Sequence, residues 1–278
     1  MGPDWTGGPC RLARPTPKWL TGPAAERTAR PAIDASVSVS VDLFIRKLRA
    51  RHDLSSEEES ALRSMQWSQR SAERNQVIVR SGEELDHSIL LLSGFALRSK
   101  FVADGSRQIV ETNVAGDFVD LHGFILRRLE HEISAASRCD MATVPHSELT
   151  RVTNHMPRLT RVLWFQTLVD AAIHREWMLV LGKKRSRARI AQLFCEMHVR
   201  LDLVGLADKG GYPLPFSQQE LADITGMTPV HLNRSLKELR DAGLVTYRNG
   251  QVELHDPVGL ARDAQFDQAY LHLGRHEI

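Results

Sequence analysis

The side chains best suited to contact a polyanion cluster between residues 228 and 240, where the chain reads TPVHLNRSLKELR. Leu232, Leu236 and Leu239 recur at a helical spacing, so we expect them to turn one face of a helix toward a core. The other faces then carry amide, guanidinium and ammonium donors, which reach base edges and phosphates in the major groove of duplex DNA. The side chains expected on these exposed faces are Val230, His231, Asn233, Arg234, Lys237 and Arg240.

Local signals make this helix the second of a pair. Ser217 and Glu220 have the spacing of a capping box, which predicts that a first helix begins there. Gly226 can adopt the positive φ of a tight turn between two helices. Thr228 then caps the second helix, and Pro229 occupies its first position. The segment therefore predicts a helix-turn-helix.

A hairpin follows this pair. Gly243 ends the second helix, and residues 244–247 and 251–254 flank an Asn249-Gly250 turn. Together these elements predict a winged helix that binds double-stranded DNA, while two packed helices and a hairpin in some other small α+β domain remain the alternative. The residues expected to contact DNA are Ser217, Gln218, Thr228, Pro229, Val230, His231, Asn233, Arg234 and Lys237.

Upstream, a series of short strands alternates with glycine-containing turns. Ser55 and Glu58 form another capping-box signature, which predicts a helix ahead of the strands. Spacings of about ten residues between turns favour an antiparallel barrel or sandwich. The predicted strands cover residues 76–80, 88–92, 95–102 and 107–113, with a further pair between residues 133 and 144.

Residues 157–181 predict one long helix that begins with Pro157. Apolar residues occupy several of its faces, so the helix is expected to pack against its own domain as well as against a partner. One set recurs near heptad spacing, which is typical of a helix that pairs with a second copy. The residues expected at this dimer interface are Leu159, Val162, Gln166, Val169, Ile173 and Val180.

Bulk properties limit the class of protein. The chain has 278 residues, 42% hydrophobic and 25% charged, with a net charge of +2, and is long enough for two compact domains. Its three cysteines are widely separated, so neither a disulfide framework nor a metal site is expected. No apolar run reaches the ~20 residues needed to span a bilayer, and no secretory signal is evident. We therefore expect a cytoplasmic protein with no membrane contact.

The segment RSGEELDHSILLLSGFALRSKFVADGSRQIVETNVAGDFVDL and the helix-turn-helix, with Gln219-Glu220-Leu221-Ala222, Gly226 and Asn233-Arg234, resemble the Crp/Fnr family of bacterial regulators. The likeness runs from about residue 43 to 254. It implies an α+β fold with an N-terminal antiparallel β-roll (a double-stranded β-helix), a long dimerisation helix and a C-terminal winged helix-turn-helix. The implied domain limits are a disordered tail at 1–40, a sensor at 41–156, the helix at 157–182, the DNA-binding domain at 183–260 and a C-terminal tail at 261–278.

The resemblance also implies a function. Such a regulator binds palindromic promoter sites as a homodimer, and RNA polymerase is an expected partner. Arg234 matches the family position whose arginine contacts a guanine, a role that suits a bidentate guanidinium. Pro229 and Val230 depart from the family pattern, so its DNA sequence preference does not carry over.

The nucleotide pocket of the family is not retained. Gly116-Asp117-Phe118 is present, but Val119-Asp120 replaces a Gly-Glu pair and Leu129-Glu130 stands where an Arg-Ser pair is expected. A phosphate needs positive or N–H-rich surroundings, and carboxylates repel it. We therefore expect no binding of cyclic AMP in the usual mode, and no bound cofactor.

The cysteines and histidines bear on other sensing chemistries. Only Cys10 lies in the N-terminal region where cluster-binding relatives carry several cysteines, which argues against an iron–sulfur cluster. Cys139 and Cys195 lie in apolar patterns typical of buried, inert thiols. Haem stays open, because five histidines lie in or near the predicted sensor: His87, His122, His131, His146 and His155.

Two other functions remain as alternatives to a DNA-binding regulator. One is a haem- or small-molecule-binding sensor that acts through protein partners without binding DNA. The other is an enzyme, but the sequence has no Gly-x-Ser-x-Gly elbow, no Walker phosphate loop and no His-Glu-x-x-His motif. The chain is therefore not expected to be an enzyme.

Overall fold

A computed structural model describes residues 40–276 of the chain. The tail predicted at residues 1–40 therefore lies outside the described residues, except for Ser40. Among residues 40–276, no helix is both long enough and apolar enough to cross a membrane.

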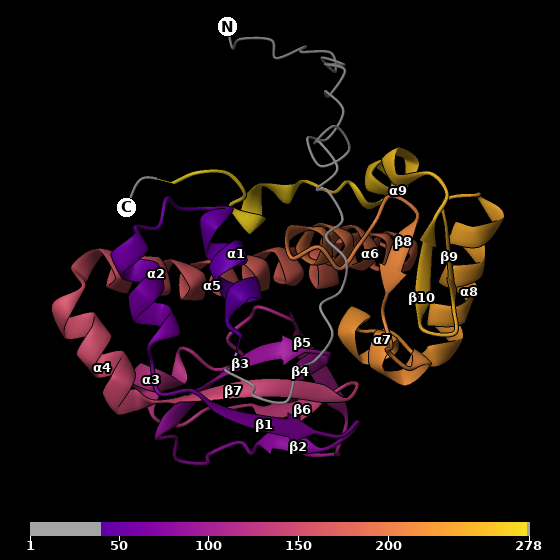
Figure 1. Cartoon of the computed structure of the whole chain (residues 1–278). Helices are drawn as coiled ribbons and strands as arrows, with labels where there is room; N and C mark the ends of the chain where they lie inside the picture. The colour runs from indigo at the N-terminus through magenta and orange to yellow at the C-terminus, as the bar shows by residue number, and fades with distance from the viewer. Residues whose placement is uncertain (1–39, 277–278) are drawn as a thin grey trace, which may run out of the picture. The chain divides into compact units, whose positions relative to one another are not determined.

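The N-terminal domain is built on two antiparallel sheets, ordered β1-β7-β3 and β2-β6-β4-β5 (Figure 1). Both sheets contribute to one apolar cluster, which includes Leu91 of β3, Ala96 of β4, Ile133 of β6 and Met141 of β7. This arrangement confirms the predicted antiparallel β fold. The strands are β1 (Ser68–Ala72), β2 (Val77–Val79), β3 (His87–Ser93), β4 (Phe95–Phe101), β5 (Arg107–Val114), β6 (Glu132–Ala135) and β7 (Cys139–Pro145).

Helices cover the other face of the β1-β7-β3 sheet. Leu90 of β3 and Val144 of β7 alternate with the residues that face the second sheet, and they join a core with Phe44, Leu149 and Leu159 from the surrounding helices. The predicted capping box is present at the start of α2, where Ser55 and Glu58 bond reciprocally. These helices are α1 (Asp42–Arg49), α2 (Ser56–Arg63), α3 (Gly123–Leu126), α4 (His146–His155) and α5 (Pro157–Lys183).

The long helix α5 begins at Pro157, as the sequence predicts, but the stripe predicted to face a partner packs inward. Burial against the rest of its own chain removes these six side chains from any dimer contact, which corrects that prediction. The physical reason is that Leu159 and Val162 join the sensor core, and the later positions of this face are buried against other parts of the same chain. The inward side chains are Leu159 (0% exposed), Val162 (0%), Gln166 (8%), Val169 (4%), Ile173 (4%) and Val180 (0%).

A different stripe of α5 is open to solvent. Trp164, Leu168 and Met178 are 63%, 51% and 73% exposed, values far above those of core residues. These side chains belong to a series spaced alternately by three and four residues, the pattern of a coiled-coil seam. The series is Arg161, Trp164, Leu168, Ala171, Arg175, Met178 and Gly182, which we call the open stripe.

The C-terminal domain has a three-stranded sheet, ordered β8-β10-β9, packed with helices. Asn249 and Gly250 have φ values of 51° and 70°, so they form the predicted hairpin turn between β9 and β10. Strand β8 was not predicted. The elements are α6 (Ser186–Leu203), β8 (Gly211–Pro213), α7 (Gln218–Thr225), α8 (Pro229–Asp241), β9 (Val245–Arg248), β10 (Gln251–Leu254), α9 (Pro257–Ala264) and the 3₁₀ helix η2 (Gln268–Leu271).

The chain beyond β10 is folded. The tail boundary predicted at residue 260 falls inside α9, and η2 packs on α5. Figure 1 shows this yellow segment returning past α6 and α5 toward α1. Leu260 and Leu271 are each 1% exposed, so the segment contributes to the core.

Candidate functional site

The helix pair α7–α8 is held by the predicted local bonds. Ser217 Oγ accepts from Glu220 N at 3.1 Å, and Glu220 Oε2 accepts from Ser217 N at 2.6 Å. Gly226 ends α7 with φ +61°, the left-handed conformation that glycine adopts without strain. Thr228 Oγ1 accepts from His231 N at 3.3 Å and so caps α8. These bonds fix where α8 starts and which way it runs.

One face of α8 is buried. Leu232 and Leu239 are fully buried and Ser235 is 4% exposed, while Leu236, predicted to face the core, is only half-buried. These positions lie on one side of the helix, so the side chains between them point to solvent. The core thus orients the polar face of α8 outward.

Seven of the nine predicted DNA-contact residues lie on α8 or cap it, while Ser217 and Gln218 lie at the start of α7. Eight of the nine are exposed, and Pro229 is half-buried at the helix start. The Arg234 side chain is 78% exposed, and its Nε donates to Glu238 Oε1 at 3.2 Å. Asn233 Nδ2 donates to Gln218 Oε1 at 3.0 Å, which joins the two helices in one polar surface. The exposed residues are Ser217, Gln218, Thr228, Val230, His231, Asn233, Arg234 and Lys237.

A groove of about 450 Å³ separates α8 from the β9–β10 hairpin. Lys237 and Arg240 line it from the helix, and Arg248 and Asn249 line it from the hairpin. The sequence prediction did not include Arg240, Arg248 or Asn249 among the contact residues. The sequence signal that could have identified Arg248 is its position beside the Asn-Gly turn. There it lies across the groove from α8, the helix expected to contact DNA.

The four residues predicted to form a degenerate nucleotide pocket do not form a phosphate cradle. Val119 and Leu129 are core residues, 0% and 1% exposed. Asp120 is fully buried; its Oδ1 accepts from Ile89 N at 2.6 Å, and burial raises the pKa of Asp120 to about 7. Glu130 is exposed and pairs with His131 at 3.2 Å. All four are apolar or acidic, which is unfavourable for a phosphate.

A buried ionic cluster connects the β-roll to α5. Arg98 is 2% exposed, pairs with Glu111, and donates through Nε to Val119 O at 2.8 Å. His174 Nε2 lies 2.9 Å from the Glu111 carboxylate, and this bond raises the pKa of His174. Burial would raise the pKa of Glu111, but the charges of Arg98 and His174 hold it below its usual range.

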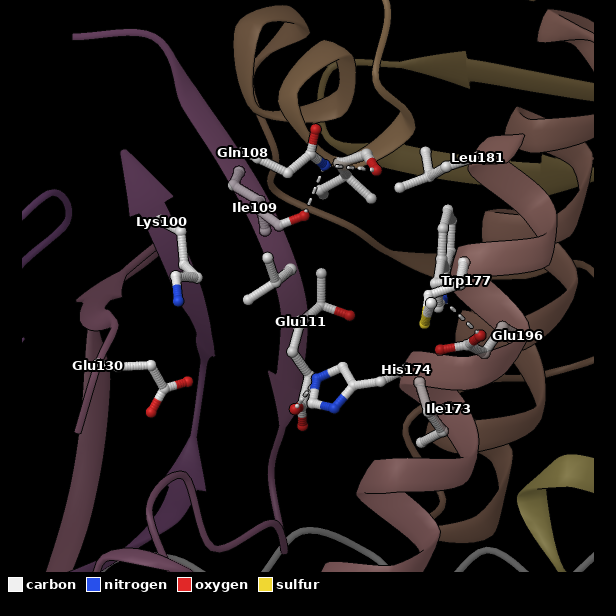
Figure 2. A pocket seen from close by; sticks show the side chains of 14 residues that line it. Lys100, Gln108, Ile109, Glu111, Glu130, Ile173, His174, Trp177, Leu181 and Glu196 are labelled. Carbon is white, nitrogen blue, oxygen red and sulfur yellow. Dashed lines mark hydrogen bonds and ion pairs between the residues drawn. The ribbon is translucent and has the colours of Figure 1, made fainter. Parts of the chain in front are cut away.

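A cavity of about 290 Å³ lies beside this cluster, where β5 faces α5, α6 and α7 (Figure 2). Its walls are mainly apolar, with Ile109, Ile173 and Trp177 among them. Glu111 and His174 point toward each other at one end, and Trp177 Nε1 donates to Glu196 Oε2 at 3.0 Å. This volume suits a small, largely apolar molecule. The cavity could not be predicted from the sequence, because residues of β4, β5, α5, α6 and α7 assemble it.

The five histidines of the predicted sensor do not gather at one place, although two of them are neighbours. The rings of His122 and His131 lie 5.4 Å apart, while His146 bonds Ser88 at 3.2 Å and His155 Nδ1 bonds Arg151 O at 2.8 Å. Within residues 40–276 no group of three or more histidine, cysteine or acidic side chains is arranged to hold a metal ion.

Comparison with known proteins matches both domains. Residues 69–155 match the cyclic nucleotide-binding domain, and residues 188–263 match the Crp-like helix-turn-helix domain. The transcriptional activator protein FnrL of Cereibacter sphaeroides is 28% identical over 193 residues, which cover 68% of this chain and 77% of FnrL. The nitrogen fixation regulation protein FixK of Bradyrhizobium diazoefficiens is 28% identical over 173 residues, covering 60% and 69% of the two chains.

Solved structures share the fold. FixK2 from Bradyrhizobium japonicum superposes with a TM-score of 0.65 at 24% identity, covering 70% of this chain and 96% of FixK2. The global regulator CLP from Xanthomonas campestris gives a TM-score of 0.58 at 18% identity, covering 73% and 100%. These relatives are transcription regulators rather than enzymes. With a nucleotide-binding-like β-roll followed by a Crp-like helix-turn-helix, the chain belongs to the Crp/Fnr family of DNA-binding transcription regulators.

Proposed function

We propose that this regulator binds palindromic promoter DNA as a homodimer and reads base edges with α8. The observation that carries the proposal is the outward face of α8, where Asn233, Arg234 and Lys237 are exposed while Leu232 and Leu239 anchor the helix. Amide and guanidinium groups on one helix face form the hydrogen bonds that distinguish bases in the major groove. Arg240 and Arg248 beside the groove are placed to contact phosphates.

The open stripe of α5 supports a homodimer. Pairing two copies through Trp164, Leu168 and Met178 would cover apolar surface that is exposed in the single chain. Such a pair has a twofold axis, which matches the symmetry of a palindrome with half-sites about 34 Å apart. RNA polymerase is proposed as a further partner, because the relative FnrL is a transcriptional activator.

Cyclic AMP is not proposed as the signal. Asp120 and Glu130 stand where a phosphate would need positive charge, and the buried guanidinium of Arg98 is already paired with Glu111. Isothermal titration calorimetry with cyclic AMP and cyclic GMP should show no stoichiometric binding at micromolar concentration. Stoichiometric micromolar binding of either nucleotide would contradict this.

DNA reading is tested by footprinting the promoter region upstream of the protein's own gene. A protected palindrome is expected. In gel-shift titrations Arg234→Ala should weaken binding by roughly 1 to 3 kcal/mol. The preference for one base should be lost at a single position in each half-site. Arg262→Ala, a change of the same chemistry at an exposed position on α9, is the control and should bind like the wild type. Protection that ignores sequence at every salt concentration would refute the proposal.

The dimer is tested by sedimentation velocity. Trp164→Glu places a charge in the open stripe and should shift the protein toward monomer. Leu206→Glu introduces the same charge at another exposed leucine, 43% exposed and outside α5, and should leave the dimer intact. A wild type that remains monomeric at concentrations that saturate DNA would contradict the homodimer.

A second candidate function is small-molecule sensing, which the 290 Å³ cavity favours. The ligand would then act on the DNA-binding regulator itself. The visible absorption spectrum of the purified protein tests for haem.

A further inference from the structure

Residues 265–276, which we call the strap, extend beyond the matched helix-turn-helix domain, which ends at residue 263. They leave α9 on the DNA-binding domain and return along α5 to the loop after α1, at the edge of the sensor domain (Figure 1). A segment that touches both domains can fix their relative orientation. Its contacts decide whether it does so.

The strap is anchored at its start to the DNA-binding domain. Lys184 Nζ donates to Gln265 O at 3.5 Å and, just before the strap, to Ala264 O at 2.9 Å. Also before the strap, Arg187 pairs with Asp263 at 2.8 Å. Phe266 is 9% exposed, so this end of the strap also buries an aromatic ring.

The middle of the strap joins a buried polar hub. The Tyr270 hydroxyl donates to Glu196 Oε2 at 2.8 Å and accepts from Gln192 Nε2 at 2.9 Å. The other oxygen of Glu196 accepts from Arg200 at 3.2 Å. Arg200 in turn donates to the carbonyl of Thr112 on β5 at 2.7 Å. The strap therefore bonds to Glu196, which in turn bonds Arg200, the residue through which α6 contacts the sensor.

The far end of the strap is bound to the sensor domain. Arg51, 2% exposed, donates to Leu271 O at 3.0 Å, and its own carbonyl accepts from His276 N at 2.7 Å. The ring of Phe165 on α5 packs against His276, with centroids 5.0 Å apart, and against His52, at 4.7 Å. Leu271 and Arg51 both line a small space between the strap and the sensor domain. Lifting the strap would expose this charge and these apolar groups together.

We infer that the strap is a built-in tie that holds the DNA-binding domain against the sensor domain and keeps α8 in the orientation that binds DNA. This inference rests on the proposed function. The strap favours DNA binding rather than opposing it, because the strap leaves the outward face of α8 open. Its bonds instead reach α6 and the loop after α1. When a smaller fraction of molecules holds α8 in the orientation that binds DNA, the apparent Kd for DNA rises in inverse proportion to that fraction.

The test compares the full chain with a chain ended after Ala264. Trypsin reports domain release, because Lys183 and Arg185 flank the hinge between α5 and α6 and are exposed. Mass spectrometry identifies cuts at these two residues. Without the strap, hinge cleavage should quicken and DNA affinity should fall by about tenfold, which corresponds to a competent fraction near one tenth. Circular dichroism confirms that both chains are folded.

A milder variant covers the case in which the shortened chain does not fold. Tyr270→Phe keeps the ring and removes the bond to Glu196. Hinge cleavage should therefore quicken and DNA affinity should fall, each by less than in the shortened chain. Tyr212→Phe removes a comparable buried hydroxyl bond, to Phe194 O at 2.6 Å, within the DNA-binding domain, and should leave hinge cleavage unchanged.

The outcomes separate the two claims. Hinge cleavage unchanged in the strap variants overturns the tie, and faster cleavage with tighter DNA binding overturns its direction. If the full chain shows no specific DNA binding, the proposed function fails. The cleavage rates then still decide whether the strap joins the domains.

Discussion

Replacing Asp120 with asparagine should stabilise the protein at alkaline pH relative to acidic pH. Asp120 is fully buried, and its Oδ2 has no hydrogen-bond partner among residues 40–276. Burial raises its pKa from 3.8 to about 7. The folded state therefore favours the neutral carboxyl of Asp120. The stability that this neutral carboxyl contributes is fully present below pH 3.8 and is lost as the pH rises through about 7. Asparagine stays neutral at every pH and can keep the bond from Ile89 N.

The size of the effect follows from the two pKa values. Each pKa unit between folded and unfolded states corresponds to about 1.4 kcal/mol. Between pH 5 and pH 8 the free energy of unfolding of the wild type should therefore fall by roughly 2 to 3 kcal/mol relative to the variant. Urea unfolding of both proteins at pH 5, 6, 7 and 8 measures this difference. Parallel pH profiles for the two proteins would refute the reasoning.

Asp117 provides a matched control three residues away. It is also buried, but it pairs with Lys47 and, at 2.8 Å, with Arg200. Burial would raise the pKa of Asp117, but these two charges outweigh it and lower the pKa. Asp117→Asn should therefore destabilise the protein at pH 7 by roughly 3 to 5 kcal/mol, because it leaves Lys47 without its carboxylate and removes one of the two carboxylates that pair with Arg200. Two aspartates in one turn should thus respond in opposite directions.

Three further predictions concern stability. His174→Gln should destabilise at pH 6 and less so at pH 9 in urea unfolding, because the bond to Glu111 raises the pKa of His174 and its contribution is lost as the pH rises through that raised value. Gly211→Ala should lower the free energy of unfolding by roughly 1 to 3 kcal/mol in thermal scans, since φ is +146° and a Cβ would overlap the carbonyl of Val252. Leu239→Ala should cost roughly 2 to 5 kcal/mol in the same scans, because the side chain is fully buried.

Features set by nearby residues could be predicted from the sequence. The capping boxes of Ser55 and Ser217 and the Asn249-Gly250 turn need only neighbours within a few positions, and the structure contains all three. The positive φ of Gly226 belongs to the same group. Local chemistry alone therefore located the helix-turn-helix and its wing.

Features set by distant residues could not be predicted. Strand β1 reads SQRSA and has four exposed residues of five, so only its pairing with β7 makes it a strand. On α5, the inward series and the open stripe both have near-heptad spacing. Only the sensor core decides which of them is covered, and that information lies outside the helix. The cavity beside Trp177 was invisible for the same reason.

The burial of α6 has a consequence for how the protein unfolds. Every residue from Ile190 to Leu201 is buried, including Gln192, Glu196 and Arg200, because the helix is covered by both domains at once. The domain boundary predicted at residue 183 therefore does not separate two parts that unfold independently. Calorimetry should show one transition for the whole molecule, and an isolated fragment that begins at α6 would expose one flank of this helix and associate with itself.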